Sequence, residues 1–139
     1  AAGERTSTIY DLNMVGMVEN QAVDVFQPDL GNCGGYIHFN DLAAIAARNN
    51  VTMAPHNPNG PISVAQGLQA MGFVTNGYIL ETVGNDQECE LAAELLKNPE
   101  VLKMKDGFID LPKGPGLGVE LNIEGVERRP FQRYYHTTR

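Results

Sequence analysis

The sequence has little of what several classes of protein need. Cys33 and Cys89 are its only cysteines, and their spacing indicates neither a zinc site nor a disulfide framework. The net charge is −7, whereas nucleic-acid binding needs clustered Lys and Arg to neutralise phosphates. No apolar run reaches the ~18 residues of a membrane-spanning helix, and no signal peptide is visible. We therefore expect a cytoplasmic protein that binds neither nucleic acid nor membrane.

A glycine-rich phosphate-binding loop is also missing. Gly31, Gly34 and Gly35 come close to one, but they lack the G-x-G-x-x-G order that opens a helix in dinucleotide-binding proteins. We expect these glycines to serve the turn into the next helix instead.

What the sequence does have is a regular series of chemically capable side chains. Glu4, Asp29, His56 and Glu81 each end a short apolar run, at intervals of 25, 27 and 25 residues. One strand, one helix and two loops need about that length, since a βαβ unit takes ~30 residues. Active-site residues of a (β/α) barrel lie at the carboxyl ends of successive strands. The series therefore predicts both an α/β barrel and its site.

The segments between these residues alternate in type, as a parallel sheet with helical crossovers requires. A doubly wound open sheet would alternate in the same way, but the strand-end placement of all the candidate residues favours the barrel. The predicted strands are 22–27, 51–54 and 77–80, and the predicted helices are 8–19, 36–48, 62–71 and 86–97.

The chain is short for such a fold. It has 139 residues, whereas a complete barrel takes roughly 200 to 250, and Ala1 to Glu4 already have the character of a strand's tail. We expect a fragment that lacks the N-terminal half of a longer protein. Residues 1–105 would then be the C-terminal portion of the barrel, and residues 106–139 a segment that packs on another domain.

Asp29 and His56 are the strongest pair of candidates. If their strands are neighbours, the strand tips lie about 5 Å apart, so the carboxylate can accept the imidazole N–H and orient the ring for general acid or base work. The alternative for His56 is a structural histidine bonded to the backbone.

Glu4 and Glu81 are expected at the carboxyl ends of the strands on either side of this pair. Glu4 could ligate Mg²⁺, which takes oxygen ligands and often links carboxylates to an anionic substrate, although an ion pair with Arg5 is the alternative. Glu81 could hydrogen-bond a substrate oxygen or a charged intermediate.

Several motifs together resemble a known family. They look like the C-terminal half of the enolase superfamily in its mandelate racemase/muconate lactonizing enzyme branch, and most of all like sugar-acid dehydratases of the galactonate dehydratase type. The motifs are Gly3-Glu4-Arg5, Gln27-Pro28-Asp29 with Gly34-Gly35, Ala54-Pro55-His56-Asn57-Pro58 with Gly60-Pro61, and Gly114-Pro115-Gly116-Leu117-Gly118.

The resemblance implies a role for each candidate in a modified, TIM-type enolase barrel. Glu4 would be a ligand of an essential Mg²⁺ at the end of the fifth strand. Asp29 and His56 would form the catalytic dyad on the sixth and seventh strands, and Glu81 the assisting acid on the eighth. The tail from about Asp106 would return to a capping domain.

The activity so implied is that of a hydro-lyase in a homo-oligomer. It would remove the α-proton of a sugar acid and eliminate water to give a 2-keto-3-deoxy sugar acid. Two further metal ligands and the opposing base would precede Ala1, so this chain alone would be inactive.

Other functions stay open. A racemase, epimerase or cycloisomerase of the superfamily would keep the same residues. A retaining glycosidase would need two carboxylates about 5 to 5.5 Å apart, which Glu4 and Glu81, three strands apart, fit badly. A non-catalytic structural half-barrel or binding subunit is the alternative outside enzymes.

Overall fold

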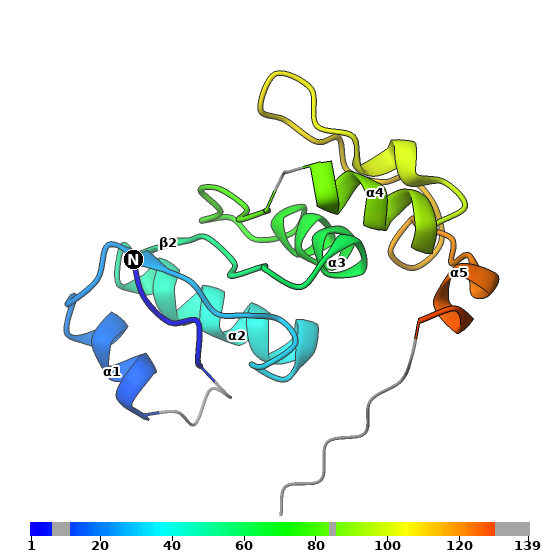
Figure 1. The fold of residues 1–139 in the computed structure, drawn as a ribbon. Helices are drawn as coiled ribbons and strands as arrows, with labels where there is room; N and C mark the ends of the chain where they lie inside the picture. The colour runs from blue at the N-terminus through cyan, green and yellow to red at the C-terminus, as the bar shows by residue number, and fades with distance from the viewer. Residues whose placement is uncertain (7–11, 84–85, 130–139) are drawn as a thin grey trace, which may run out of the picture.

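Four parallel segments form the sheet. The structure is a computed structural model that describes residues 1–6, 12–83 and 86–129. Strands β1 (Val25–Phe26) and β2 (Thr52–Met53) pair in parallel, while Ala2 bridges to Phe26 on one side and Gly77 to Met53 on the other. Each segment thus lies beside the one that follows it in the chain, in the order that a (β/α) barrel requires (Figure 1).

Helices connect these segments, as predicted, and two more elements follow that the pattern did not predict. The second and third predicted helices are confirmed to within one residue, whereas the fourth ends two residues early at Leu95. Residues 8–11 of the first predicted helix lie outside the described residues. The helices are α1 (Leu12–Glu19), α2 (Gly35–Arg48), α3 (Pro61–Met71), α4 (Asp86–Leu95), the 3₁₀ helix η1 (Pro99–Leu102) and α5 (Ile123–Glu127).

The strands are shorter than predicted. Ala22 was assigned to the first of them, but its N–H donates to the carbonyl of Met17 at 2.8 Å, so Ala22 belongs to the turn that ends α1. The strand predicted over 77–80 is reduced to the bridge at Gly77 and one further ladder bond, from Tyr78 N to Met53 O at 2.8 Å. No described segment pairs with its other edge, which leaves Tyr78 and Ile79 69% and 58% exposed.

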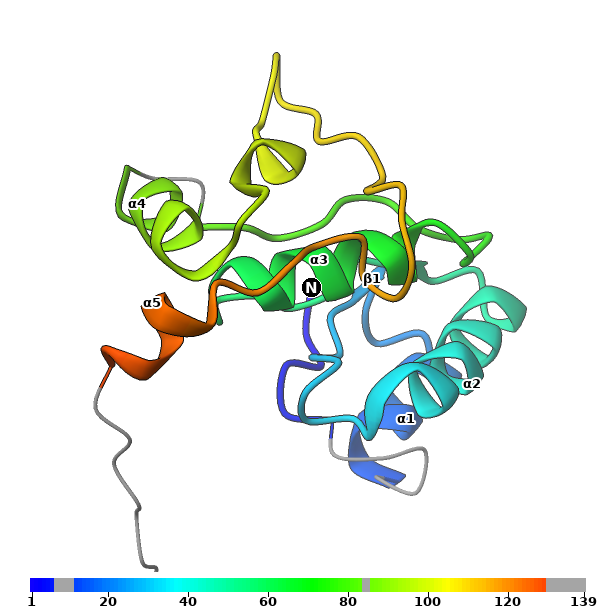
Figure 2. The same ribbon diagram turned by 90° about the vertical axis from the view of Figure 1, so that its right-hand side faces the viewer.

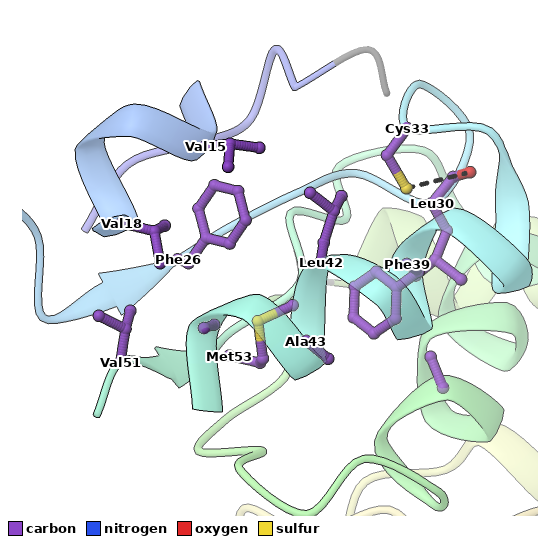
Figure 3. Packing of buried hydrophobic residues seen from close by; sticks show 12 residues of the cluster. Val15, Val18, Phe26, Leu30, Cys33, Phe39, Leu42, Ala43, Val51 and Met53 are labelled. Carbon is purple, nitrogen blue, oxygen red and sulfur yellow. Dashed lines mark hydrogen bonds between the residues drawn. The ribbon is translucent and has the colours of Figure 1, made fainter. Parts of the chain in front are cut away.

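The core lies between the sheet and the first two helices. Phe26 of β1 is completely buried, and its ring points toward Val15 and Val18 of α1, with Leu42 of α2 nearby (Figure 3). Burial of a phenylalanine side chain contributes about 1.5 to 3 kcal/mol to stability. Because Phe26 precedes Asp29 by only three residues, the same packing fixes the strand end that carries Asp29.

The segment after η1 returns across α3. The side-chain amide of Gln69 donates to the carbonyls of Pro112, at 3.0 Å, and Leu117, at 3.3 Å, and the chain then reaches α5 beside α4 (Figure 2). Asn122 ties α5 to α4 by donating its side-chain N–H to Glu94 O at 3.0 Å. The described part of residues 106–139 is therefore anchored on α3 and α4.

No helix of the described residues has both the length and the apolar character that crossing a membrane demands.

Gly3 offers a test of how closely the N-terminal segment packs on β1. It has φ +124°, and a Cβ there would lie 2.5 Å from Cδ2 and Cε2 of Phe26. Since overpacking costs typically 1–3 kcal/mol, Gly3→Ala should lower the free energy of unfolding in urea by about that much more than Gly107→Ala. Gly107 also has a positive φ, +82°, but open space around it. Equal losses in the two variants would contradict the close approach.

Candidate active site

Asp29 and His56 lie side by side at the carboxyl ends of β1 and β2. A parallel bridge pairs the two residues, and Nδ1 of His56 lies 3.1 Å from Oδ2 of Asp29. Because a carboxylate only accepts hydrogen bonds, Nδ1 carries the hydrogen of this bond, and Nε2 is the ring nitrogen left to exchange a proton. The predicted contact between these two side chains is therefore present.

A proline precedes each member of this pair. Pro28 comes directly before Asp29 and Pro55 directly before His56, and both prolines are fully buried. The pyrrolidine ring fixes φ of the proline and restricts the residue before it to extended conformations. Both strands therefore reach the rim along a stiff path, which limits how far the two side chains can drift apart.

The carboxylate of Asp29 is held from several sides. It is only 2% exposed, and its Oδ1 accepts the main-chain N–H groups of Gly31, at 2.7 Å, and Asn32, at 3.2 Å. Its Oδ2 accepts the side-chain N–H of Asn59 at 2.9 Å in addition to the bond from His56. These bonds satisfy a buried carboxylate that would otherwise be costly to desolvate.

Gly34 and Gly35 serve the turn from β1 into α2, as predicted. Gly34 and Gly35 have φ +96° and +79°, and α2 begins at Gly35. The turn between β1 and α2 brings the N–H groups of Gly31 and Asn32 back onto Asp29.

Asn57, for which the sequence pattern predicts no role, connects Glu81 to the Asp29–His56 pair. The main-chain N–H of Asn57 donates to Oε2 of Glu81 at 3.1 Å, and the side chain of Asn57 donates to the carbonyl of Glu81 at 3.1 Å. Since Asn57 follows His56 directly, Glu81 is attached to the backbone that carries the histidine.

Glu4 is not hydrogen-bonded to the other three candidates within the described residues. Its Oε2 accepts the N–H of Gly3 at 3.1 Å, and among the described residues no hydrogen bond or ion pair joins it to Arg5, Asp29, His56 or Glu81. Within the described ranges, no group of three or more His, Cys, Asp or Glu side chains could hold a metal ion. Glu4 has the hard oxygen donor that Mg²⁺ prefers, so it fits as one ligand, but the described residues do not complete a magnesium site.

Comparison with known proteins decides the family. The family model described as "Enolase C-terminal domain-like" matches residues 1–126. The chain belongs to this family.

Solved structures agree with this assignment. A "putative Mandelate racemase/Muconate lactonizing enzyme" from Burkholderia SAR-1 is 28% identical, with a TM-score of 0.80 over 96% of this chain and 32% of its own. A "putative dehydratase" from Mesorhizobium loti is 29% identical, with a TM-score of 0.78 over 94% of this chain and 34% of its own. A mandelate racemase/muconate lactonizing enzyme-like protein from Rubrobacter xylanophilus DSM 9941 is 26% identical, with a TM-score of 0.78 over 95% and 32%. The chain thus spans about a third of the length of these structures.

This enolase-family chain has a cavity among its later helices. It measures about 370 Å³ and is formed by α3, α4, η1 and the segment after η1. Its lining is mostly apolar and includes Val64, Ala92 and Met104, and none of the four candidate residues contributes to it. Thr82, which directly follows Glu81, also lines it, so the cavity reaches the backbone beside the candidate active site.

Cys33 is hydrogen-bonded to the backbone of Asp29. Its N–H donates to the main-chain carbonyl of Asp29 at 2.8 Å, and its side chain is fully buried beside Leu30 (Figure 3). Burial raises the pKa of the Cys33 thiol from 9.0 to about 11, and the negative charge of Asp29 adds to the rise. The thiol is therefore neutral at physiological pH and unsuited to act as a nucleophile.

The bond from Asn59 to Asp29 should contribute measurably to stability. Because hydrogen bonds to charged groups contribute about 1.5–3 kcal/mol and a partly exposed bond less, Asn59→Ala should lower the free energy of unfolding by about 1 kcal/mol. Asn32→Ala is the matched control, since Asn32 uses its main-chain N–H, which the substitution keeps. Urea denaturation of both variants measures the difference, and equal midpoints would rule the contribution out.

Cys33 should make the protein less stable at high pH. A pKa raised on folding favours the neutral thiol, so the stabilisation is complete below pH 9.0 and is lost as the pH rises toward about 11. Urea midpoints measured from pH 8 to 11 should fall more steeply for the parent than for Cys33→Ala. Cys89→Ala, at an exposed thiol, should keep the parent's slope; an unchanged slope in Cys33→Ala would contradict the assignment.

Proposed function

We propose that this chain belongs to a Mg²⁺-dependent lyase that removes the α-proton of a sugar acid and eliminates water to give a 2-keto-3-deoxy sugar acid. The observation that carries the proposal is the hydrogen bond between Asp29 and His56 at adjacent strand ends, in a chain of the enolase family. The similarity to a structure named as a "putative dehydratase" supports the choice of reaction.

The chemical difficulty is that a carbon next to a carboxylate is only weakly acidic, since its enolate concentrates negative charge. A bound Mg²⁺ would supply electrostatic stabilisation of that charge, and Glu4 would be its ligand from this chain, together with ligands outside it. Removal of the α-proton would require a base that is also outside the described residues.

His56 would act at the leaving group. After the α-proton is lost, the C–O bond at the 3-position breaks, and the imidazolium of His56 gives a proton to the departing hydroxide, which leaves as water. Asp29 holds the ring by its bond to Nδ1, so the exchangeable proton is the one on Nε2. Glu81 would donate or accept a hydrogen bond at the substrate oxygens from the neighbouring strand end.

The organisation of the whole protein is part of the proposal. Residues 1–105 would be the C-terminal portion of the barrel, and residues 106–139 would lead to a capping domain. The rest of the protein would provide the other metal ligands and the base, and the protein would work in the cytoplasm as a homo-oligomer. The chain's coverage of about a third of its structural neighbours fits this arrangement.

A racemase or cycloisomerase reaction is the second candidate. Its support is that similar structures are named after mandelate racemase and muconate lactonizing enzyme. The same His56 would then protonate or deprotonate the α-carbon, and no water would be lost.

A substrate screen of the protein expressed at full length separates these functions. Hexonic and pentonic acids are incubated with Mg²⁺ or with chelator, and formation of 2-keto-3-deoxy acid and of epimers is measured. We expect the keto acid only with Mg²⁺, and a fall in kcat of about 10²- to 10⁴-fold in His56→Asn, the range typical of a lost general acid. Asp29→Asn should also lower kcat, whereas Asn32→Ala should not.

Two results would overturn the proposal. Epimers without keto acid would favour the racemase, and turnover by His56→Asn at the parent's rate would exclude the role given to His56.

A further inference from the structure

We propose that Asn57 is a positioning residue that sets the place of Glu81 at the rim. The inference rests on the proposed function, in which Glu81 assists the reaction, and it adds a residue to which neither the motifs nor the family match gives a role.

One residue holds Glu81 at two points. The main-chain N–H of Asn57 binds the carboxylate Oε2, and the side-chain N–H₂ binds the main-chain carbonyl, both at 3.1 Å. The first bond fixes the reactive end of the side chain, and the second fixes the backbone from which that side chain extends. Glu81 is itself exposed, so these bonds restrain a group that solvent would otherwise leave free to move.

The surroundings of Asn57 indicate that its N–H groups, and not its side-chain oxygen, explain why an asparagine occupies this position. Asn57 is only 1% exposed, and its Oδ1 is buried without a hydrogen-bond partner among the described residues. An unsatisfied buried acceptor costs free energy, and an apolar side chain of similar size would avoid that cost. Packing alone therefore does not account for an asparagine here, whereas donation to Glu81 does.

The position of Asn57 in the chain links the two parts of the site. Asn57 follows His56, whose strand end is paired with Asp29 by the parallel bridge. The backbone between Pro55 and Pro58 therefore holds the histidine and the anchor of Glu81 together. A shift of Glu81 relative to His56 requires the bonds of Asn57 to break.

The test is a double-mutant cycle in the protein expressed at full length, on whichever acid it converts. Asn57→Ala should lower kcat by about three- to ten-fold, the effect of losing one typical hydrogen bond, with KM changed by less than about two-fold. Asn57→Ser, which keeps a hydroxyl donor, should recover part of the rate. In a Glu81→Ala background, Asn57→Ala should cost almost nothing more, because coupled residues are not additive.

Asn76 provides the matched control. Its side chain also donates to main-chain carbonyls, those of Ala43 at 3.2 Å and Val51 at 2.9 Å, but at the opposite end of the sheet. Asn76→Ala should lower the melting temperature without changing kcat. If Asn57→Ala lowered kcat by the same factor with and without Glu81, its role would be structural and the inference would be wrong.

A crystallographic measurement does not depend on turnover. In the parent, Oε2 of Glu81 should stay within hydrogen-bond distance of Asn57 N, and in Asn57→Ala the main chain at Glu81 should be displaced. An unmoved Glu81 would overturn the inference even if the reaction were confirmed. Failure of the parent to convert any acid, together with a displaced Glu81, would overturn the proposed function and leave the positioning role supported.

Discussion

The parallel register between β1 and β2 is the constraint on which the rest of the site depends. Val25 lies opposite Thr52 and Phe26 opposite Met53, and the same register, carried three residues further, places Asp29 opposite His56. A slip by one residue would turn every side chain of one strand to the other face of the sheet. It would expose Phe26 and separate the carboxylate from the imidazole. Core packing and site geometry are thus fixed by one alignment.

The sequence predicted the features that repeat along the chain. The spacing of Glu4, Asp29, His56 and Glu81 reflects the length of a βα unit, and the apolar periodicity of 36–48 and 62–71 reflects helices with one buried face. Both signals are local and survive in a single sequence. They were enough to predict the order of the segments and the contact between Asp29 and His56.

The features that the sequence did not predict depend on where the backbone turns after the strands end. Asn57 and Asn59 stand in the same short motif as His56, and nothing in their spacing distinguishes the amide that binds Asp29 from the amide that binds Glu81. The early end of the first predicted strand has a similar cause, because Ala22 could bond to either the sheet or α1, and the turn after α1 decides the choice. Composition and periodicity carry no information about such competition.

The unpaired edge beside Gly77 has a consequence for how this polypeptide behaves. Among the described residues, that segment is hydrogen-bonded on one side, to β2, and the side chains of Tyr78 and Ile79 are largely exposed there. An open edge of this kind is a template on which any extended chain can add a strand. While this edge stays open, the polypeptide should associate with itself through the sheet, so its solubility depends on whether the edge is covered and not on its surface charge alone.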